Sequence, residues 1–457
     1  MDPAQPSAYF EDASGFRGHA DSVYTPQSEA EVQRILVEAS ASLTPITISG
    51  AGTGVTGGRV PFGGIVLSLE RFRHIDIQPG SARVGAGVLL RELQQAASSS
   101  EQFYAPDPTE ISASIGGTIA TNASGSRSFL YGDTRRHVLA LRVALMNGSV
   151  LELRRGDPIP FETRAIPAPS TKKHTAGFPL RPGMDVLDLF IGSEGTLGVV
   201  MEAVVRLLPI PEELLSGIVF FRSDDDALTA VDMWREISGL RMLEYIDAGS
   251  LDLLRPTYSD IPGAAKSALL IEQQIDNDSE YDAWDSRLTQ TQALKEASWF
   301  AASDFDRERF RRFRHALPEA VNDLVRRRGV LKMNTDFAVP LERNREMIAI
   351  YRDALEREFP GQYVIFGHIG DAHVHVNILP NSGEDAERAK AVITQLAREA
   401  AAFGGTVSAE HGLGKRKSHL LAIQYTEEQI ESMRAVKRRF DPHWLLGRGT
   451  LFPEVTS

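Results

Sequence analysis

"ISGAGTGVTGGRVPFGGIVLSL", residues 48–69, places glycines at positions 52, 54 and 57 in the spacing G-x-G-x-x-G, directly after an apolar, β-rich run. In a Rossmann fold such glycines open a helix that crosses back to a parallel strand. Here the next apolar run already begins at Ile65, whereas a crossover with its helix needs at least about 10–12 residues. Pro61, Gly63 and Gly64 also oppose a helix in that interval. The stretch therefore indicates a fold other than the Rossmann fold.

Glycines that do not open a helix still let backbone N–H groups approach an anion, because no Cβ blocks the path and a positive φ costs little. We therefore interpret residues 50–58 as a pyrophosphate-binding loop. A glycine-rich hairpin without a ligand is the alternative that this stretch alone leaves open, since an isolated glycine motif is weak evidence.

Two further segments have the same texture. Small residues dominate "YAPDPTEISASIGGTIATNASGSR", residues 104–127, and glycines return in "LFIGSEGTLGVVMEAVVRLLP", residues 189–209, just before a valine-rich strand. Small side chains let a backbone segment approach a large, flat ligand closely, and the hydroxyl and amide groups among them offer hydrogen bonds. Three separated glycine-rich segments suggest one extended cofactor that lies across a domain.

The composition is that of a large globular protein with more than one domain. The chain has 457 residues, of which 42% are hydrophobic and 24% charged, and a formal net charge of −12. This acidic balance does not favour nucleic acid as a partner. The absence of cysteine excludes disulfides, a thiolate nucleophile and cysteine-ligated iron–sulfur clusters in this chain. Any metal must therefore be held by nitrogen and oxygen ligands.

A second kind of chemistry is concentrated in the C-terminal half. "GHIGDAHVHVN", residues 367–377, brings three histidines around a glycine turn, and its alternation predicts that residues 373, 375 and 377 share one strand face. "SAEHG", residues 408–412, adds a glutamate and a fourth histidine after a predicted helix. Two imidazoles and one carboxylate form a metal site with open positions, suited to Zn²⁺ or another divalent transition metal. The alternative is a set of structural histidines around a turn.

These motifs together resemble those of the FAD-linked D-2-hydroxyacid dehydrogenases, the group of D-lactate dehydrogenases, D-2-hydroxyglutarate dehydrogenases and glycolate oxidase flavin subunits. Residues 50–58, 106–108 with 116–125, and 192–198 are similar to the family's "GxGTGxxGG", "PDP" with "GGxxATNAxG", and "GSEGTLGI". The resemblance covers almost the whole chain. It implies an α+β fold: a two-part FAD-binding domain of the vanillyl-alcohol-oxidase type, an α+β substrate domain, and a C-terminal segment that returns to the FAD domain.

The resemblance implies noncovalent FAD, since the first loop has no histidine and the chain has no cysteine for a covalent link. The residues implied to bind FAD are Gly50, Gly52, Thr53, Gly54, Val55, Gly57, Gly58, Pro106, Asp107, Gly116, Gly117, Thr121, Asn122, Ser124, Gly125, Tyr131, Glu194, Gly195, Gly198 and Val199.

The resemblance also assigns roles in the C-terminal half. It implies that His368, His375 and Glu410 bind a divalent metal, most readily zinc, and that His411 is the general base. Arg314 aligns with the arginine that binds the substrate carboxylate, although the pattern around it is also that of an ordinary helix with solvated arginines. Asn377 is expected to orient the substrate or a ligand. His373 departs from the commoner asparagine, so a role as ligand or as pocket lining stays open.

The substrate is expected to be a small D-2-hydroxy acid. Relatives specific for dicarboxylates resemble "KxDxxxP" where this chain reads "NTDFAVP", residues 334–340, so Asn334 replaces a second cation. D-lactate is therefore favoured, with D-2-hydroxyglutarate or glycolate as alternatives. A flavin-dependent ether-lipid synthase, which performs no net oxidation, is the alternative from another class.

The expected domains are an FAD-binding domain at residues 1–210, a substrate and metal domain at 211–414, and a returning C-terminal segment at 415–457. The segment begins with a predicted capping box, Thr426 to Gln429, and departs from the family's usual "NPGK" at residues 447–450. We expect the electron acceptor to be a quinone, a cytochrome or another flavoprotein. The sequence is compatible with either a monomer or a homodimer. No membrane span or signal peptide is predicted, which favours the cytoplasm, with peripheral docking at a membrane left open.

Overall fold

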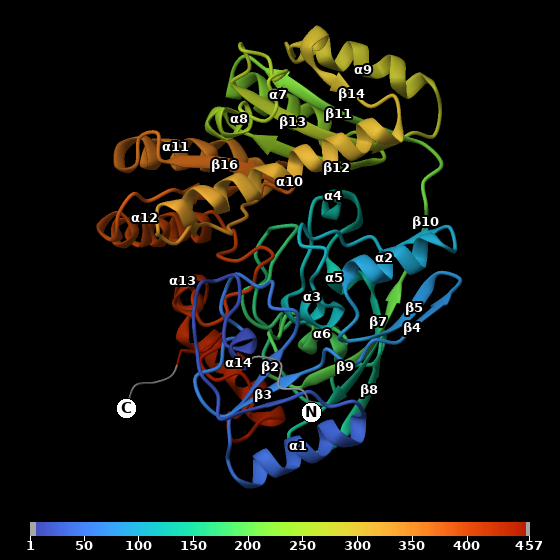
Figure 1. Ribbon diagram of the computed structural model, residues 1–457, viewed down its shortest axis with the longest axis vertical. Helices are drawn as coiled ribbons and strands as arrows, with labels where there is room; N and C mark the ends of the chain where they lie inside the picture. Colours follow the sequence, from blue (N-terminus) through green and yellow to red (C-terminus); the bar gives the residue numbers. More distant parts are fainter. Residues whose placement is uncertain (1–5, 454–457) are drawn as a thin grey trace.

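The computed structural model describes residues 6–453, and these form two lobes that are stacked along the long axis of the molecule (Figure 1). The chain starts in the lower lobe, passes into the upper lobe after β10 (Leu208–Pro209), and comes back to the lower lobe in its last helices. Both lobes combine helices with sheets, so the predicted α+β class is confirmed.

The lower lobe is built on antiparallel and parallel sheets that lie side by side. A five-stranded antiparallel sheet has the order β4 (Ile75–Gln78), β5 (Ser81–Gly85), β9 (Val199–Arg206), β7 (Val138–Ala144), β8 (Val150–Arg154). A three-stranded parallel sheet has the order β1 (Ser22–Tyr24), β3 (Ile65–Ser68), β2 (Ile46–Ser49), and β6 (Gln102–Phe103) pairs with β10.

Helices and 3₁₀ turns surround these sheets. The apolar stripe of α1, which is formed by Val32, Ile35, Leu36 and Ala39, packs in one cluster with residues of both the three-stranded and the five-stranded sheet. The helices and 3₁₀ turns of this lobe are η1 (Pro6–Tyr9), α1 (Glu29–Ala41), α2 (Leu90–Ser98), α3 (Ile115–Thr121), α4 (Ser128–Tyr131), α5 (Thr134–His137), α6 (Leu187–Phe190), η5 (Ser418–Leu420), α13 (Leu421–Gln424) and α14 (Glu427–Phe440).

The glycine stretch joins strands β2 and β3 without a helix between them. Residues 50–64 contain no helix, which confirms that they do not open a Rossmann crossover. Strands β2 and β3, which this stretch joins, nevertheless pair in parallel. The hairpin considered as an alternative is therefore excluded, since a hairpin pairs its strands antiparallel. The connection must therefore return from the end of β2 to the start of β3, and it does so as a loop.

The upper lobe is one seven-stranded antiparallel sheet with helices on both faces. Its order is β14 (Trp299–Phe300), β11 (Leu214–Phe221), β13 (Ser267–Gln274), β12 (Leu240–Ile246), β16 (Tyr363–Gly367), β17 (His375–Ile378), β15 (Met333–Asn334). Its helices and 3₁₀ turns are α7 (Asp224–Trp234), α8 (Ala248–Leu254), α9 (Ser279–Gln290), η2 (Lys295–Ala297), α10 (Asp304–Arg327), η3 (Leu341–Arg343), α11 (Asn344–Glu358), η4 (Ile369–Asp371) and α12 (Gly383–Ala402).

The alternation of side chains along each strand sorts the upper core into two layers. Ile246 of β12 belongs to the layer that packs against α8 and α10. Tyr245, its neighbour in sequence, belongs to the opposite layer, with α7 and α11. Because side chains alternate, Glu244 lies on the same face as Ile246, so a carboxylate faces α10 from the middle of an apolar sheet. Helix α11 buries Met347, Tyr351 and Leu355 on one face and ends at Glu358, two residues before Pro360.

The C-terminal segment is tied to the lower lobe by backbone contacts. The Ile46 N–H donates to the Leu445 carbonyl over 2.8 Å, and Leu446 forms a parallel bridge with Ile46 at the start of β2. Helix α14 begins with the predicted capping box between Thr426 and Gln429, which is confirmed. No helix within residues 6–453 combines the length and the apolar character that crossing a bilayer requires.

Candidate active site

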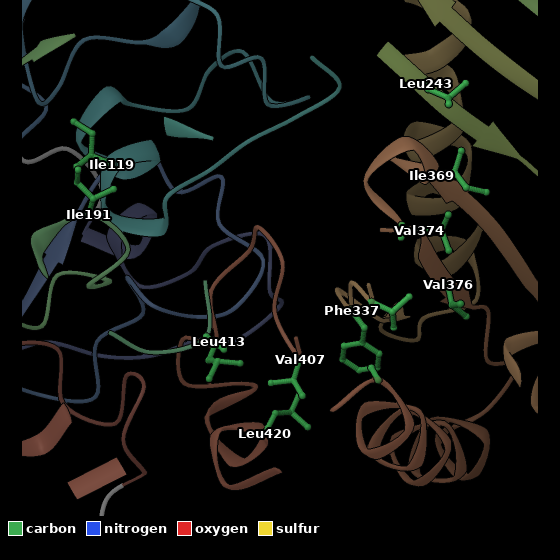
Figure 2. Packing of buried hydrophobic residues seen from close by; sticks show 14 of the residues in the cluster. Ile119, Ile191, Leu243, Phe337, Ile369, Val374, Val376, Val407, Leu413 and Leu420 are labelled. Carbon is green, nitrogen blue, oxygen red and sulfur yellow. The ribbon is translucent and has the colours of Figure 1, made fainter. Parts of the chain in front are cut away.

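The three glycine-rich segments line one cavity of about 340 Å³. Residues 48–59 form one wall, residues 108–125 a second, and residues 190–200 a third, and Glu410 and His411 also line the cavity. The segments meet because α3 and the loop after α6 exchange backbone bonds: Gly192 N–H donates to Ile119 O and Glu194 N–H to Ala120 O. Figure 2 shows the side chains of Ile119 and Ile191 next to each other. A cavity built from three separate loops suits one extended cofactor.

The glycines matter where the chain bends or comes close to the cavity. Gly52 has a φ of +82°, and a Cβ at this position would lie 2.6 Å from Arg59 Nη1. Arg59 fixes the turn, since its Nη1 donates to the Gly50 carbonyl over 2.8 Å. At Gly54 a Cβ would meet only Asp12 Oδ2, at 3.8 Å, so the position opens into the cavity. A side chain there would fill the space that a cofactor needs, and the cradle therefore fits FAD.

Most of the predicted FAD residues line this cavity. These are Gly50, Gly52, Thr53, Gly54, Val55, Gly58, Gly116, Gly117, Thr121, Ser124, Gly125, Glu194, Gly195 and Gly198. The other six are not among the residues that line it: Gly57, Pro106, Asp107, Asn122, Tyr131 and Val199. For example, Asn122 donates from Nδ2 to Asp133 over 2.8 Å, and the Tyr131 hydroxyl accepts from Gln274 Nε2 over 2.7 Å.

Two of the lining residues have their polar atoms engaged by the protein. The Glu194 carboxylate accepts the N–H groups of Leu413 and Gly414 over 2.9 and 2.7 Å, and burial raises the pKa of Glu194 to about 7. The Ser124 hydroxyl donates to Glu410 Oε2 over 2.6 Å. Both contacts join the cofactor loops to the loop that carries residues 408–414, so the cavity and that loop are one unit.

Replacement of Gly54 by leucine should weaken FAD binding about 5- to 150-fold, because forcing a side chain into a packed site costs roughly 1–3 kcal/mol. Gly54 is not among the glycines with positive φ, so the backbone itself tolerates the change. Flavin content after purification and titration of the apoprotein with FAD measure the effect. Gly263→Leu is the matched control, since a Cβ there has nothing within 4 Å. Equal FAD affinity in the two variants would show that FAD does not bind in this cavity.

The predicted histidines are presented by the hairpin of β16 and β17. Phe366 pairs with His375 across the hairpin, and Gly367 turns the chain with a φ of +126°. Because β17 begins at His375, the strand face holds His375 and Asn377, and His373 sits just before the strand. Apolar neighbours lock the hairpin in place: Figure 2 shows Ile369, Val374 and Val376 stacked along it next to Leu243 of β12.

The loop with Glu410 reaches the hairpin through the segment that follows β15. Ala338 bridges to His373 on one side and to Thr406 on the other, and the Ala409 N–H donates to the Asp336 carbonyl over 2.8 Å. The side chains of Phe337 and Val407, from two of these segments, lie near each other in the buried cluster (Figure 2). Three segments that are far apart in sequence thus come together as neighbouring strands of backbone, and their polar side chains face one point.

The structure brings the three predicted metal ligands together. His368 Nε2 and His375 Nε2 each lie 3.1 Å from the same oxygen, Glu410 Oε1. His373 is within the same group, whose candidate ligand atoms all lie within 4.8 Å of one another. A second, overlapping group joins His375 and Glu410 to Asp336 and His411. Imidazole nitrogens and a carboxylate oxygen converging on one point are a donor set that fits a divalent transition ion.

Charged residues from both lobes surround this donor set. Glu244 of β12 accepts from His368 Nδ1 and, over 2.6 Å, from Nε of Arg314 on α10. Lys173, which is 1% exposed, lies in the lower lobe and donates to Glu410 Oε2 over 3.2 Å. Glu410 is therefore held at one oxygen by the lower lobe and faces the histidines of the upper lobe with the other.

The pKa values of these groups follow from their neighbours. Burial alone would raise the pKa of Glu410, but His368 and Lys173 hold it well below its usual range. Burial would lower the pKa of His368, yet the carboxylates of Glu410 and Glu244 raise it to about 9. Arg314 and His368 likewise keep the pKa of buried Glu244 well below its usual range. The carboxylates at the centre are thus ionised, as a metal ligand and its supporting acceptor must be.

His411 lies at the border between the histidine cluster and the glycine cavity, where it lines the cavity wall. Its ring stacks on that of His375, with ring centres 5.2 Å apart. Its Nδ1 is 3.4 Å from Asp336 Oδ1 and its Nε2 is 3.8 Å from Glu410 Oε1. Burial lowers the pKa of His411 to about 4, so the imidazole is neutral at neutral pH and can accept a proton.

Arg314 and Asn377 occupy different settings. Arg314 is half-way along α10 and, besides Glu244, its Nη1 donates to Thr109 Oγ1 of the lower lobe over 3.2 Å. It therefore spans the gap between the lobes beside the cluster. Asn377 is buried on β17, and its Nδ2 contacts the His375 carbonyl at 3.4 Å. The roles of both in substrate binding stay predictions.

Sequence reasoning missed three residues of this site. Asp336 is inside the "NTDFAVP" motif, where only Asn334 bears on the expected substrate. Glu244 could have been noticed as the one acidic residue in a largely apolar strand, "LRMLEYI". Lys173 lies in a long segment without periodicity, residues 155–186, which gives no local sign that its side chain is buried.

Comparison with known proteins identifies both halves of the chain. A family model described as FAD linked oxidases, C-terminal domain, matches residues 210–451, and one described as FAD binding domain matches residues 20–154. Among curated proteins, the chain is 30% identical to glycolate oxidase subunit GlcD of Bacillus subtilis, over 96% of this chain and 90% of that protein.

Two further relatives are similar to the same extent. D-lactate dehydrogenase of Anaerostipes hadrus is 29% identical and D-2-hydroxyglutarate dehydrogenase of Xanthomonas citri pv. viticola is 30% identical, each over 93% of this chain and 88% of the relative. Among solved structures, an alkyldihydroxyacetonephosphate synthase has a TM-score of 0.66 at 18% identity, over 95% of this chain and 77% of that chain. This last likeness concerns the fold alone.

Proposed function

The chain belongs to the FAD-linked oxidases, as its motifs predicted, and from this premise we propose that it oxidises a D-2-hydroxy acid, D-lactate first, to the 2-oxo acid. It is an FAD-linked oxidoreductase of the group whose members are named D-lactate dehydrogenase, D-2-hydroxyglutarate dehydrogenase and glycolate oxidase subunit. The proposal adds a substrate, a metal centre and roles for individual residues.

One observation carries the proposal: Glu410 and His411 line the same cavity as the glycine loops. A proton acceptor and a carboxylate of the donor cluster therefore border the space that fits a flavin. Oxidation of an alcohol to a carbonyl removes the hydroxyl proton to a base and a hydride, from the carbon that bears the hydroxyl, to a two-electron acceptor. A base at the edge of a flavin cavity meets that geometric requirement.

Bound FAD supplies the two-electron acceptor, and a divalent ion, zinc most readily, supplies a Lewis acid for the substrate hydroxyl. His368, His375 and Glu410 are the residues that would hold the ion. His411 accepts the hydroxyl proton at its imidazole, which is neutral at pH 7. Arg314 binds the substrate carboxylate from the upper lobe, and Asn377 orients the substrate beside His375. Lys173 and Ser124 keep Glu410 turned toward the histidines.

The substrate is proposed to carry a single carboxylate. Asn334 is the residue at the position where a second cation would bind the distal carboxylate of a dicarboxylic acid, and it is a neutral side chain at the end of β15. D-lactate is therefore preferred to D-2-hydroxyglutarate, and glycolate is the smaller alternative. For the reoxidation of the flavin we propose a quinone, a cytochrome or a second flavoprotein. We also propose residues 1–210 with 415–457 as the FAD-binding domain and 211–414 as the substrate domain.

Anaerobic addition of D-lactate to the purified holoprotein should bleach the flavin absorbance, whereas L-lactate should leave it unchanged. The enantiomers present the same groups, so only a site that fixes carboxylate, hydroxyl and hydrogen together can distinguish them. Glycolate and D-2-hydroxyglutarate in the same assay rank the alternatives, and metal analysis of the same sample tests the centre. A flavin that no 2-hydroxy acid reduces would refute the dehydrogenase proposal and leave the non-redox ether-lipid synthase class as the better account.

A further inference from the structure

His373 stands in the middle of the histidine cluster, and none of the proposed roles uses it. It is fully buried, and the centre of its ring lies 4.6 Å from that of His375 and 5.3 Å from that of His368. The resemblance described above implies asparagine at this position, so the imidazole is a feature of this chain. A buried imidazole that merely fills space is costly, because both ring nitrogens need partners.

One nitrogen of His373 has a clear partner. Its Nε2 lies 3.1 Å from Asp336 Oδ1. The carboxylate of Asp336 is fully buried and is surrounded by donors, since it accepts the Ser408 hydroxyl over 2.8 Å and the His411 N–H over 2.9 Å. A carboxylate in such surroundings accepts hydrogen bonds, so the His373 proton resides on Nε2.

The other nitrogen of His373 is an acceptor without a donor. With the proton on Nε2, the ring presents a lone pair at Nδ1, and this buried atom has no hydrogen-bond partner within residues 6–453. Leaving a buried acceptor unsatisfied costs about 1–3 kcal/mol. A lone pair of an imidazole whose opposite N–H is fixed by a carboxylate is the arrangement by which proteins orient a metal-binding histidine.

We propose that His373 is a fourth ligand of the metal centre, bound through Nδ1, with Asp336 as the carboxylate that orients it. A ligand atom of His373 falls within the same 4.8 Å group as those of His368, His375 and Glu410. The proposal rests on the proposed function, since it presupposes that the cluster holds an ion. The centre would then offer three imidazoles and one carboxylate, and a substrate oxygen would join as a fifth ligand, a coordination that zinc accommodates.

The test counts imidazole ligands directly, by X-ray absorption spectroscopy of the zinc-loaded holoprotein and of two variants. His373→Asn keeps a donor for Asp336 and removes the ring nitrogen, while His373→Phe keeps the ring volume and removes both nitrogens. We expect three imidazoles around zinc in the wild type and two in each variant. Competition with a chelator should show zinc bound at least about tenfold more weakly in the variants. His137→Asn, which removes another buried imidazole bonded to the Tyr131 carbonyl, is the control and should leave both readouts unchanged.

The outcomes of these measurements distinguish the role of His373 as a ligand from the existence of the metal centre. Two imidazoles in the wild type, or unchanged zinc affinity and ligand number in both variants, would overturn the role of His373 while leaving a metal centre in place. A wild-type protein that binds no divalent ion would instead refute the metal centre itself. Because the spectroscopy does not require turnover, a variant with altered activity still reports on its ligands, and either variant that folds is sufficient.

Discussion

His411→Ala is expected to lower the rate of flavin reduction by D-lactate about 10²- to 10⁴-fold, the range over which a positioned base acts in catalysis. His411 lines the cavity and its imidazole is neutral at neutral pH, so the variant loses the acceptor for the hydroxyl proton. Stopped-flow measurement of flavin bleaching under anaerobic conditions gives the rate of the step itself. FAD content and metal content should stay at the wild-type level, because neither the glycine loops nor the donor set loses an atom.

The control for this variant is His419→Ala, which removes an exposed imidazole from the same stretch of chain. D-lactate should reduce the flavin of this variant as fast as it reduces that of the wild type. If His411→Ala were reduced at the wild-type rate, the proton acceptor would have to be sought elsewhere in the cluster. If instead the variant lost its metal, His411 would be a ligand of the second group with Asp336 and not the base.

Glu410→Ala is expected to abolish metal binding and to lower the free energy of unfolding of the metal-free protein by about 3–5 kcal/mol at pH 7, the usual cost of removing one partner from a buried ion pair. The variant leaves Lys173 and His368 without the carboxylate that they share. Denaturant unfolding monitored by circular dichroism, together with metal analysis, measures both effects.

The sign of this effect with pH follows from the lowered pKa of Glu410. A carboxylate whose pKa is lower in the folded than in the unfolded state stabilises the fold above its unfolded pKa, and this stabilisation is lost as the pH falls. The difference between wild type and Glu410→Ala should therefore be fully present at pH 7 and shrink in acid. Glu387→Ala, at an exposed position of α12, is the control and should unfold like the wild type. Retention of zinc by Glu410→Ala would contradict the proposed ligand set.

Much of the architecture could be predicted because it depends on local sequence. The glycine segments, the turn at residues 367–375 and the capping box of α14 each follow from a pattern within about ten residues. Which side chains of a glycine loop face the ligand could not be predicted this way: Asn122 and Tyr131 lie in the right loops, yet their polar atoms bond to Asp133 and Gln274. The direction in which a side chain points depends on how its segment packs against distant parts of the chain. The motif predicts only which segments lie near the ligand.

The residues that support the cluster illustrate the same limit. Glu244 and Lys173 lie about 70 residues apart in sequence and belong to different lobes. Each side chain is buried by residues from other segments of the chain. Asp336 reaches Glu410 and His411 because Ala338 bridges two chain segments. Such contacts join segments that are far apart in the sequence, and a single sequence contains no periodicity that reports them.

The shared carboxylate of Glu410 has a consequence for any attempt to build hybrids. One of its oxygens is secured by Lys173 and Ser124 from the lower lobe, and the other faces the histidines of the upper lobe. A chimaera that joined the two halves of different relatives would have to take this glutamate loop and its lysine anchor from a single parent. Otherwise the flavin cavity and the histidine cluster, each correct within its own half, would no longer face the same substrate molecule.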